Sequence, residues 1–430
     1  MKPGARIAAA IEVLDAILNR YQPVAIALAD WGKAHRFAGS ADRNAIGGLV
    51  YDALRRRASL AWALGEDTPR ALAIGAAPSA LGLAPETVSE VCDGTDHAPP
   101  PLSDRERAGL TRDLGSAPES VQADIPEWLW PSFSGQFGVN AVAEGKAMAT
   151  RAPADLRVNT LKSTREKVLK ALSGFHAVAC PYSPVGVRVA APSGAQRTPN
   201  LQAEAAFQAG WFEIQDEGSQ IAAFLSGAGP RKQVLDLCAG AGGKTLALAA
   251  LMQNTGQLYA YDADRHQLKP IFERIRRAGV RNVQVLRAGD ETALGALGPR
   301  FDIVMADAPC TGTGTWRRRP DAKWRLKPEA LAARVAEQKS VLERGAALVK
   351  PGGRLVYVTC SVLPEENTGQ IAAFLKDHAD FQIVPTDEVW GTALPGAPPP
   401  SADGRGDTLL LTPARHGTDG FFIAILLRRA

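Results

Sequence analysis

The feature that most restricts the fold is a regular alternation of strand-like and helix-like segments over residues 201–430. Short apolar runs predict strands at 233–237, 257–261, 283–286, 302–306, 354–359, 381–384 and 421–427. Amphipathic runs between them predict helices at 245–252, 268–277 and 328–349. This alternation is typical of a parallel, doubly wound, Rossmann-like α/β sheet. Such sheets bind ligands beyond the carboxyl ends of their strands, so we expect the functional residues there.

The first 200 residues follow other patterns. Residues 1–125 place apolar side chains at helical spacing and predict an all-α domain; the first helical face contains Ile7, Ile11, Leu14 and Leu18. Residues 126–200 predict a small α+β domain, with strands at 155–161, 178–180 and 185–190 and a helix at 164–172. A chain of 430 residues is also too long for one compact core. We therefore expect three domains, at 1–125, 126–200 and 201–430.

The charge of the chain is unevenly distributed. The formal net charge is only +4, but residues 131–200 carry nine Lys or Arg against three Asp or Glu. Nucleic-acid-binding proteins gather basic residues in this way. An ordinary solvated surface can show the same clustering, so the charge alone leaves both interpretations open.

The five cysteines are Cys92, Cys180, Cys238, Cys310 and Cys360. Their number is odd and their spacing matches no zinc-binding pattern, so we expect neither a disulfide framework nor a metal. The sequence shows no signal peptide and no apolar run long enough for a membrane span. We expect a cytoplasmic monomer without a membrane partner, in which free thiols can do chemistry.

A glycine-rich turn follows the first predicted strand of the α/β region. It reads Cys238-Ala239-Gly240-Ala241-Gly242-Gly243-Lys244-Thr245. Glycines let a ligand approach the backbone, and the start of the following helix can hold polar ligand atoms. Cys238 stands where a P-loop needs glycine, and Thr245 stands where a dinucleotide fingerprint needs it. Asp236 at the strand end favours the positively charged cofactor S-adenosylmethionine, with a purely structural turn as the alternative.

Acidic residues end the next two predicted strands. Asp262 can accept hydrogen bonds from both ribose hydroxyls of a nucleoside, and Asp290 can reach an adenine amino group. We expect Asp264 to face away from the ligand. Each acid is a weak signal alone, but their order after the glycine-rich turn supports a cofactor that contains a nucleoside.

Two cysteines follow predicted strands of the same sheet, in Asp307-Ala308-Pro309-Cys310 and Thr359-Cys360-Ser361. An isolated cysteine is more often a buried apolar residue, whereas two thiols beside a cofactor turn suit covalent catalysis. A thiolate that adds to carbon 6 of cytosine activates carbon 5 for methylation, and the carbon 5 proton must then be removed. Lys244 can activate a thiol, and Asp307 can bind the cytosine amino edge. The residues alone do not decide which thiol attacks.

Residues 316–324 place arginines between two tryptophans, in the order Trp-Arg-Arg-Arg-Pro-Asp-Ala-Lys-Trp. This composition suits phosphates and stacked bases. A solvated basic loop is the alternative interpretation.

Several of these motifs together resemble the Sun-type (Fmu) family of RNA 5-methylcytosine methyltransferases. The matching segments are 156–162, 214–220, 238–245, 307–310, 359–361 with Glu366-Asn367, and 419–422. The resemblance implies a class I methyltransferase domain, in which Cys360 is the nucleophile and Cys310 assists release of the product. It also implies cofactor contacts at 238–244, Asp262, Asp290 and Asp307. Ala241 is a departure, because the family usually has proline at that position.

Residues 41–55 resemble part of the NusB-like RNA-binding domain that precedes the catalytic part in bacterial small-subunit rRNA methyltransferases of this family. This resemblance implies 16S rRNA as the substrate. The same chemistry on tRNA is one alternative, and a non-catalytic RNA-binding or ribosome-assembly factor is another. The presence of both thiols together with Asp307 and Asp262 argues against an inactive site.

Overall fold

The computed structural model describes residues 1–95, 97–194, 196 and 199–430. The chain folds into two compact units, each of which combines segments that are distant in sequence. The helical unit contains Met1–Ala152, Ala191–Pro199 and Trp316–Arg325. The sheet unit contains Pro153–Ala190, Asn200–Thr315 and Leu326–Ala430. The chain thus passes between the units several times, and the three expected domain boundaries stay a prediction.

The core of the helical unit forms between α1 (Pro3–Leu18), α3 (Ser40–Arg55) and α5 (Pro69–Leu81). Ile7, Leu14 and Ile46 are fully buried there, which confirms the helical faces expected from the sequence. Burial of each such side chain contributes about 1.5–3 kcal/mol. No helix in the described part of the chain is long and apolar enough to cross a bilayer. The other helices of this unit are α2 (Val24–Ala34), α4 (Arg57–Leu64), α6 (Pro85–Val91), α7 (Asp104–Gly109), α8 (Glu119–Gln122), α9 (Trp130–Phe137), α10 (Ala141–Met148) and α18 (Pro320–Arg325).

A small antiparallel sheet opens the sheet unit. Its strand order is β2-β3-β1-β4, with β1 at Ala154–Val158, β2 at Val178–Ala179, β3 at Gly186–Val189 and β4 at Phe212–Ile214. Helix α11 (Arg165–Ala171) lies within the range predicted from the sequence and is capped by Thr164, whose side chain accepts a hydrogen bond from Lys167 N. Strand β4 is not expected from the sequence and extends this sheet beyond residue 200. A short helix, α12 (Ala205–Gln208), precedes it.

The large sheet runs in the order β10-β12-β9-β8-β5-β6-β7, and β11 pairs with β12. The strands from β5 to β9 are parallel, as expected, whereas β10, β11 and β12 are antiparallel to their neighbours. The expected parallel arrangement therefore fails for the last strands, because an apolar run carries no sign of its direction. The bounds are β5 (Gln233–Asp236), β6 (Gln257–Ala260), β7 (Val283–Val285), β8 (Phe301–Asp307), β9 (Val349–Thr359), β10 (Phe381–Val384), β11 (Leu409–Leu411) and β12 (Phe421–Arg428).

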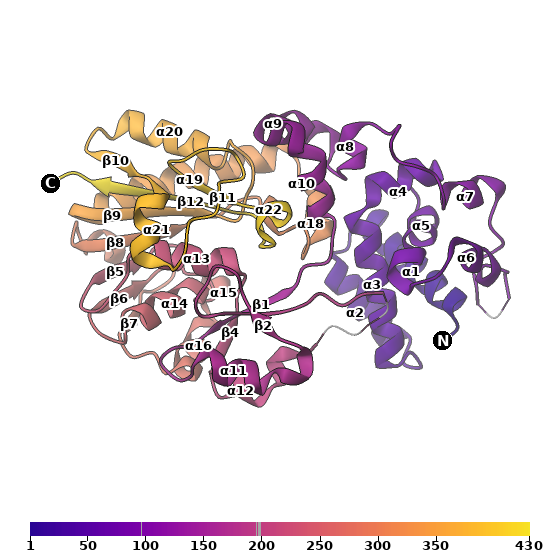
Figure 1. Ribbon diagram of the computed structural model, residues 1–430, viewed down its shortest axis with the longest axis horizontal. Helices are drawn as coiled ribbons and strands as arrows, with labels where there is room; N and C mark the ends of the chain where they lie inside the picture. Colours follow the sequence, from indigo (N-terminus) through magenta and orange to yellow (C-terminus); the bar gives the residue numbers. More distant parts are fainter. Residues whose placement is uncertain (96, 195, 197–198) are drawn as a thin grey trace. The chain divides into compact units, whose positions relative to one another are not determined.

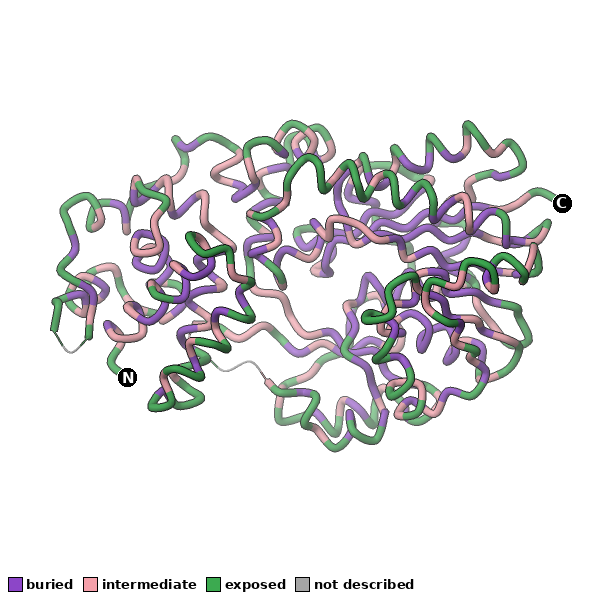
Figure 2. Tube along the Cα trace, turned by 180° about the vertical axis from the view of Figure 1, so that it is seen from behind, coloured by how far each residue is buried: buried purple, intermediate pink, exposed green. Residues whose placement is uncertain are grey.

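Helices cover both faces of the large sheet, whose strands Figure 1 shows stacked in this order. On one face, α13 (Glu217–Leu225), α14 (Gly243–Leu251) and α21 (Thr386–Ala393) share an apolar cluster with Val356. On the other face, Gly345 of α19 (Pro328–Leu348) lies so close to Leu355 that a Cβ there would be 2.7 Å from Leu355 Cδ1. Successive strand residues point to opposite faces, so the strands are buried on both sides, as the purple trace in Figure 2 shows. This is the doubly wound arrangement that the sequence predicts.

The remaining helices of the sheet unit are short or peripheral. The helix expected at 268–277 is divided into α15 (Arg265–Leu268) and α16 (Ile271–Ala278), because Pro270 cannot continue a helix without loss of a backbone hydrogen bond. The others are α17 (Glu291–Gly295), α20 (Thr368–Asp377) and α22 (Pro413–His416).

Candidate functional site

The carboxyl ends of the central strands bring the candidate residues to one edge of the large sheet. Asp236 ends β5, Asp307 ends β8 and Thr359 ends β9. The strand register pairs Asp236 with Met305, and Asp307 with Val358, so these ends lie side by side. We call this side of the sheet the carboxyl edge. It is the edge at which doubly wound sheets bind ligands.

The structure brings the two candidate thiols together at the carboxyl edge. Cys310 Sγ lies 3.3 Å from Cys360 Sγ, within hydrogen-bonding distance, and either sulfur can be the donor. The hydrogen bond to Cys360 and the burial of the side chain raise the pKa of the Cys310 thiol well above its ordinary value. A thiol that donates to a neighbouring sulfur stabilises a thiolate on that neighbour. The pair can therefore hold one thiol and one thiolate.

Two glycines allow the loops around the thiols to approach closely. Gly314 N donates to Cys360 O at 2.9 Å, and Gly420 N donates to Gly314 O at 2.8 Å. A Cβ on Gly314 would lie 2.3 Å from Gly420 O, and a Cβ on Gly420 would lie 2.5 Å from Gly314 Cα. Any larger residue at either position would force the backbones apart. This contact ties the segment before β12 to the Cys360 loop.

A buried lysine pairs with the aspartate that ends β8. Lys244 Nζ lies 2.8 Å from Asp307 Oδ2, and the side chains are 6% and 32% exposed respectively. Lys244 Nζ also lies 5.2 Å from the centroid of the Phe421 ring. Lys244 thus fixes the Asp307 carboxylate, which keeps part of its surface open. The sequence suggests a thiol as the partner of Lys244, whereas the structure gives it Asp307 and Phe421.

The glycine-rich turn leaves space in front of its backbone. Gly240 has a φ of +49°, and a Cβ there would meet no atom closer than 3.9 Å. Gly242 has a φ of +86°, and a Cβ there would lie 2.5 Å from Ile271 Cγ1. Gly242 is therefore required for packing, whereas Gly240 keeps room for a ligand. Asp262 Oδ2 accepts a hydrogen bond from Gly240 N at 2.8 Å and so ties the end of β6 to the turn.

Asp236 is a buried carboxyl group with one unsatisfied oxygen. Its Oδ2 accepts a hydrogen bond from Thr245 Oγ1 at 2.6 Å, while its Oδ1 has no partner among the described residues. Burial raises the pKa of Asp236 to about 7, the Thr245 hydrogen bond opposes this, and the charge of Asp307 adds to it. A positive charge or a hydrogen-bond donor brought to this edge would relieve the cost of the buried group. These residues therefore fit a positively charged ligand.

The other expected cofactor residues are held by local contacts. Asp290 Oδ1 caps α17 by accepting from Ala293 N at 2.9 Å. Ala241 O accepts a hydrogen bond from Arg274 Nη1 at 2.8 Å, which anchors the turn at the position where the family usually has proline. Asp264 caps α15 by accepting a hydrogen bond from His266 N at 2.7 Å, and its expected direction away from the ligand stays a prediction.

The first residues of the turn are fixed in the same way. Ala239 N donates to Tyr261 O at 2.8 Å. Burial raises the pKa of the preceding Cys238 thiol well above its ordinary value, and Asp236 adds to the effect. Cys238 is therefore protonated and suits a packing role beside the cofactor space.

Sequence reasoning did not assign the buried residues that hold the Cys360 loop. Asn367 Oδ1 accepts a hydrogen bond from Thr359 Oγ1 at 2.6 Å, and Asn367 Nδ2 donates to Ser361 O at 3.0 Å. The hydroxyls of Ser361 and Thr313 lie 2.9 Å apart and link this loop to the Cys310 loop. The sequence shows Asn367 only as part of a motif and does not indicate that it binds Thr359 and Ser361.

The tryptophan–arginine segment does not form the exposed stacking surface expected from the sequence. Trp316 is 1% exposed. Lys323 Nζ donates to Arg55 O at 2.8 Å, and Trp324 Nε1 donates to Leu54 O at 2.5 Å. These donors satisfy carbonyl groups in the last turn of α3, which have no partner within the helix. The segment therefore packs within the helical unit, with Trp316 and Lys323 buried.

The described residues include a further group of side chains with metal-ligating atoms. It consists of Asp155, Cys180 and Glu217, all buried. Arg188 binds both Asp155 oxygens, at 2.6 and 2.7 Å, and lies 3.3 Å from Glu217 Oε2. The guanidinium thus already balances the charge of these carboxylates.

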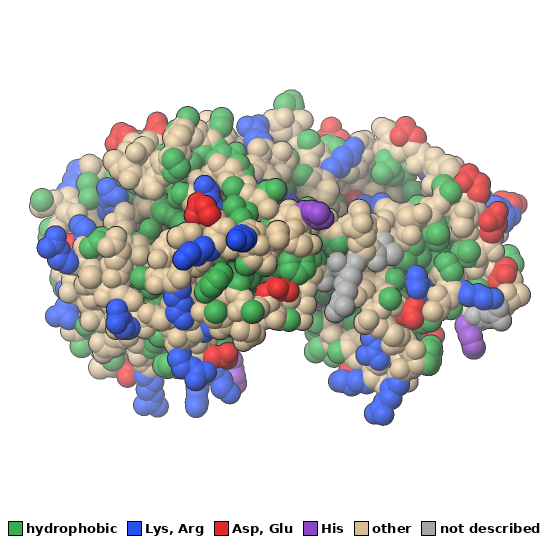
Figure 3. Space-filling model, turned by 60° about the horizontal axis from the view of Figure 1, so that its bottom comes forward, with side chains coloured by type: hydrophobic (Ala, Val, Ile, Leu, Met, Phe, Trp, Pro, Cys, Tyr) green, Lys and Arg blue, Asp and Glu red, His purple; other side chains and the backbone are tan. Residues whose placement is uncertain are grey.

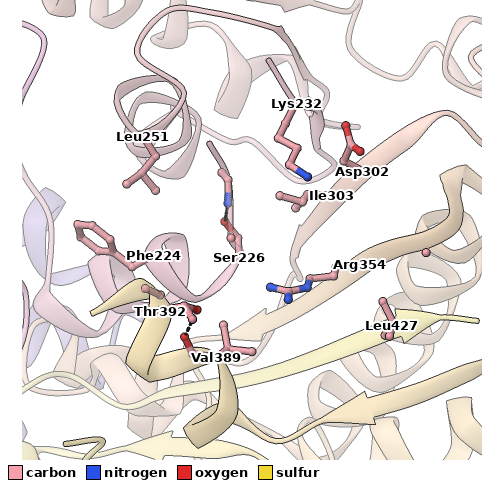
Figure 4. Close-up of a pocket in the computed structure, with 14 residues that line it drawn as sticks. Phe224, Ser226, Lys232, Leu251, Asp302, Ile303, Arg354, Val389, Thr392 and Leu427 are labelled. Carbon is pink, nitrogen blue, oxygen red and sulfur yellow. Dashed lines mark hydrogen bonds between the residues drawn. The ribbon is translucent and has the colours of Figure 1, made fainter. Parts of the chain in front are cut away.

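A cavity of about 570 Å³ lies at the opposite edge of the large sheet (Figure 4). Figure 4 shows the Arg354 guanidinium of β9 directed into it, with Phe224 and Leu251 on another wall. Asp302, near the start of β8, also lines it. A strand rises about 3.3 Å per residue, so the five steps of β8 from Asp302, which lines the cavity, to Asp307 at the carboxyl edge span roughly 16 Å. The cavity is therefore not part of the candidate site.

Family models match two parts of the chain. Residues 226–427 match a model described as 16S rRNA methyltransferase RsmB/F. Residues 125–196 match a model of the ferredoxin-like domain of RsmF/B-like methyltransferases. The first match contains all the candidate residues of the carboxyl edge.

Individual proteins give concordant matches. The chain is 34% identical over 310 residues to the probable ribosomal RNA small subunit methyltransferase B of Synechocystis sp., covering 71% of this chain and 67% of the relative. It is 34% identical over 306 residues to the ribosomal RNA small subunit methyltransferase B of Sodalis glossinidius, covering 70% and 65%. The matched region thus spans about two thirds of each relative. The crystal structure of PH0851 superposes with a TM-score of 0.74 at 26% identity, covering 99% of both chains.

Proposed function

The chain belongs to the RsmB/F family of 16S rRNA methyltransferases, and we propose that it transfers a methyl group from S-adenosylmethionine to carbon 5 of a cytosine in 16S rRNA. The observation that carries this proposal is the 3.3 Å contact between Cys310 and Cys360 beside the Lys244–Asp307 pair. Methylation of a ring carbon needs a nucleophile that activates the ring and a second group that permits its release. Methylation of an oxygen needs neither thiol.

S-adenosylmethionine is the cofactor, and the residues of the carboxyl edge fit it. The space in front of Gly240 admits a ligand close to the backbone, and the unsatisfied Asp236 Oδ1 favours a ligand with positive charge. The residues that would hold it are the turn 238–244 together with Asp262, Asp290 and Asp307. When bound, S-adenosylmethionine supplies the electrophilic methyl group.

Cys360 is the nucleophile in this proposal. Its thiolate attacks carbon 6 of the cytosine, which forms a sulfur–carbon bond and makes carbon 5 electron-rich. Carbon 5 then accepts the methyl group. Transfer of the carbon 5 proton to solvent water restores the double bond between carbons 5 and 6 and expels the Cys360 thiolate. Cys310, 3.3 Å away, assists this release.

Asp307 orients the target base. Its carboxylate is partly exposed at the carboxyl edge and can accept a hydrogen bond from the cytosine amino group. Lys244 holds the carboxylate from the buried side at 2.8 Å. A base held at its amino edge presents carbon 6 in a fixed direction, and such positioning lowers the barrier for attack.

The RNA-binding role rests on charge and on the helical unit. Helix α11 exposes Lys167 and Lys170. Figure 3 shows further lysine and arginine side chains along the lower margin of the molecule in that view. Basic side chains of this kind bind the phosphates of RNA. The helical unit, with its NusB-like residues 41–55, would add a second RNA contact. An rRNA substrate places the protein in the cytoplasm.

Bisulfite sequencing of total RNA from cells with and without the gene tests this function. We expect a cytosine of 16S rRNA to be protected from conversion in the presence of the gene and converted in its absence. The gene restored on a plasmid is the control and should restore protection. A change confined to tRNA would favour the alternative substrate, and no change at any cytosine would contradict the proposed chemistry.

A further inference from the structure

Glu366 is a buried carboxylate whose hydrogen bonds lead to the Cys310 loop. The residue is 0% exposed. It accepts hydrogen bonds from Thr311 N at 2.7 Å, from Thr311 Oγ1 at 2.5 Å and from Gln338 Nε2 at 3.0 Å. No lysine or arginine forms an ion pair with it in the part of the chain that the structure describes. A buried carboxylate without a cation is costly, so its position is maintained by these donors.

These donors enclose Cys310 on both sides. Thr311 follows Cys310 directly, and Gln338 also donates to Pro309 O at 3.0 Å on the preceding side. Gln370 Nε2 donates to Gln338 Oε1 at 3.1 Å and so fixes the orientation of that amide. The residues before and after Cys310 are therefore both attached to the Glu366 network.

The residue next to Glu366 holds the other thiol. Asn367 bonds to Thr359 and Ser361, which flank Cys360. The backbone of Glu366 is fixed in turn, because Tyr357 Oη donates to Glu366 O at 2.6 Å. Two consecutive buried residues thus set the positions of the two cysteine loops, and the 3.3 Å sulfur contact follows from this arrangement.

The charge of Glu366 acts on the Cys310 sulfur. The groups that face Cys310 are Cys360, Glu366 and Tyr357, and the Gly312 N–H is directed at its sulfur. The hydrogen bond to Cys360 and burial raise the pKa of Cys310, the carboxylate of Glu366 adds to this, and the Gly312 N–H opposes it. Lys244, the buried lysine of the carboxyl edge, is paired with Asp307. A negative charge beside Cys310 therefore disfavours a second negative charge on that sulfur.

We propose that Glu366 is a positioning residue that anchors the Cys310 loop and keeps the shared proton on Cys310, so that Cys360 is the sulfur that becomes the thiolate. This inference rests on the proposed function, because it explains why one thiol of a close pair serves as the nucleophile. Cys310 S–H then donates to the Cys360 thiolate before the substrate arrives.

Alkylation of the folded protein by iodoacetamide tests this without RNA or cofactor. A thiolate sulfur displaces iodide and forms a carbamidomethyl group, so the rate at each cysteine follows its thiolate fraction. The rate is measured from pH 6 to pH 10 by peptide mass spectrometry in the wild type, in Glu366→Gln and in Glu337→Gln. Gln at 366 can still accept from Thr311 N and Gln338, and its amide can donate to Thr311 Oγ1, so this variant removes the charge and keeps the hydrogen bonds. Glu337→Gln makes the same chemical change at an exposed position on α19.

We expect Cys360 to react faster than Cys310 in the wild type and in Glu337→Gln. In Glu366→Gln the pH midpoint of Cys310 alkylation should fall by about one unit, and the preference for Cys360 should decrease. Equal midpoints in all three proteins would overturn the role of the charge. Faster alkylation of Cys310 than of Cys360 in the wild type would overturn the assigned proton position.

A second variant covers the case in which Glu366→Gln does not fold. Thr311→Val keeps the carboxylate and removes one of its donors, so circular dichroism should be unchanged while Cys310 becomes more accessible. We expect a several-fold faster alkylation of Cys310 with an unchanged pH midpoint. An unchanged rate would overturn the anchoring role. Since these readouts need no methylation, they can succeed or fail independently of the proposed function.

Discussion

Asp236 and Asp302, which lie at opposite edges of the large sheet, differ in their hydrogen bonds and in the direction of their pKa shifts. At the carboxyl edge, Asp236 is buried with one oxygen unsatisfied, and its pKa is raised to about 7. At the opposite edge, Asp302 accepts a hydrogen bond from Gln233 N at 2.7 Å and pairs with Lys350 at 2.6 Å. Although burial opposes the change, these contacts lower the pKa of Asp302 below its ordinary value.

The cavity and the candidate site therefore lie at different edges of the large sheet. The cavity of about 570 Å³ lies at the edge where the acid is satisfied. The thiols and the Lys244–Asp307 pair lie at the edge where a buried polar group remains unsatisfied. The free-energy cost of a buried, unsatisfied polar group often marks a position where a ligand or a reaction uses that group.

Cys360→Ala should have the largest effect, because it removes the proposed nucleophile from the carboxyl edge. We expect single-turnover methyl transfer to 16S rRNA to fall by at least about 10³-fold, with RNA binding unchanged in a gel-shift assay. Cys92→Ala, at a buried thiol of the helical unit, is the matched control and should retain activity. Retention of more than about a tenth of the wild-type rate by Cys360→Ala would contradict covalent catalysis at this edge.

Cys310→Ala should have the second largest effect, because the adduct forms but its release is impaired. We expect turnover to fall by about 10²- to 10⁴-fold and a covalent protein–RNA band to accumulate on a denaturing gel. The double variant Cys310→Ala/Cys360→Ala should show no such band. Normal turnover without a band in the single variant would exclude Cys310 from release.

The raised pKa of Asp236 predicts a pH-dependent stability. The folded pKa of about 7 lies above the ordinary value of 3.8, so the folded protein retains a proton that the unfolded chain loses. Stability should therefore fall as the pH rises from about 4 to about 7 and level off above that. In Asp236→Asn this fall should be smaller than in the wild type by about 1–3 kcal/mol, measured by urea unfolding at pH 5 and pH 8.

Asp302→Asn tests the opposite pH dependence of stability at the other edge of the sheet. Its lowered pKa contributes stability that is present above the ordinary value of 3.8 and is lost as the pH falls through the folded pKa. This variant should therefore be less stable than the wild type at neutral pH. An Asp236→Asn variant with the same pH dependence as the wild type would remove the proposed contrast between the edges.

Arg354→Ala should have the smallest effect on methylation. Its side chain lines the cavity at the opposite edge, away from the thiols. We expect kcat/KM to change by less than about twofold. A tenfold loss in a folded variant would show that the cavity takes part in the reaction.

The sequence predicts most of the large sheet because its pattern is strong. The strands that were missed, β4 and β11, have three residues each and lie close to other apolar segments. The antiparallel direction of β12 is set by its pairing with β9, and no local pattern carries that information. The division of the expected helix at 268–277 could have been predicted, because Pro270 lies within it.

The carboxyl edge is predictable because topology places the strand ends together, whereas its contacts are not. The sequence identifies Cys310 and Cys360 as a pair, and their roles stay predictions. It does not show that Glu366 binds Thr311, 55 residues away, or that Trp316 is buried in the helical unit. Such partners are determined by tertiary packing. The arginines next to Trp316 suggest an exposed side chain, whereas the structure shows a buried one.

The position of β12 also has a consequence for biosynthesis. This strand lies between β9 and β10, and Gly420 just before it contacts Gly314 beside the Cys360 loop. Every other strand of the sheet leaves the ribosome before β12 does. Until it emerges, β9 has an open edge, and the Cys360 loop lacks its support. The contacts that support the Cys360 loop in the folded protein are therefore complete only after the whole of the large sheet has been synthesised.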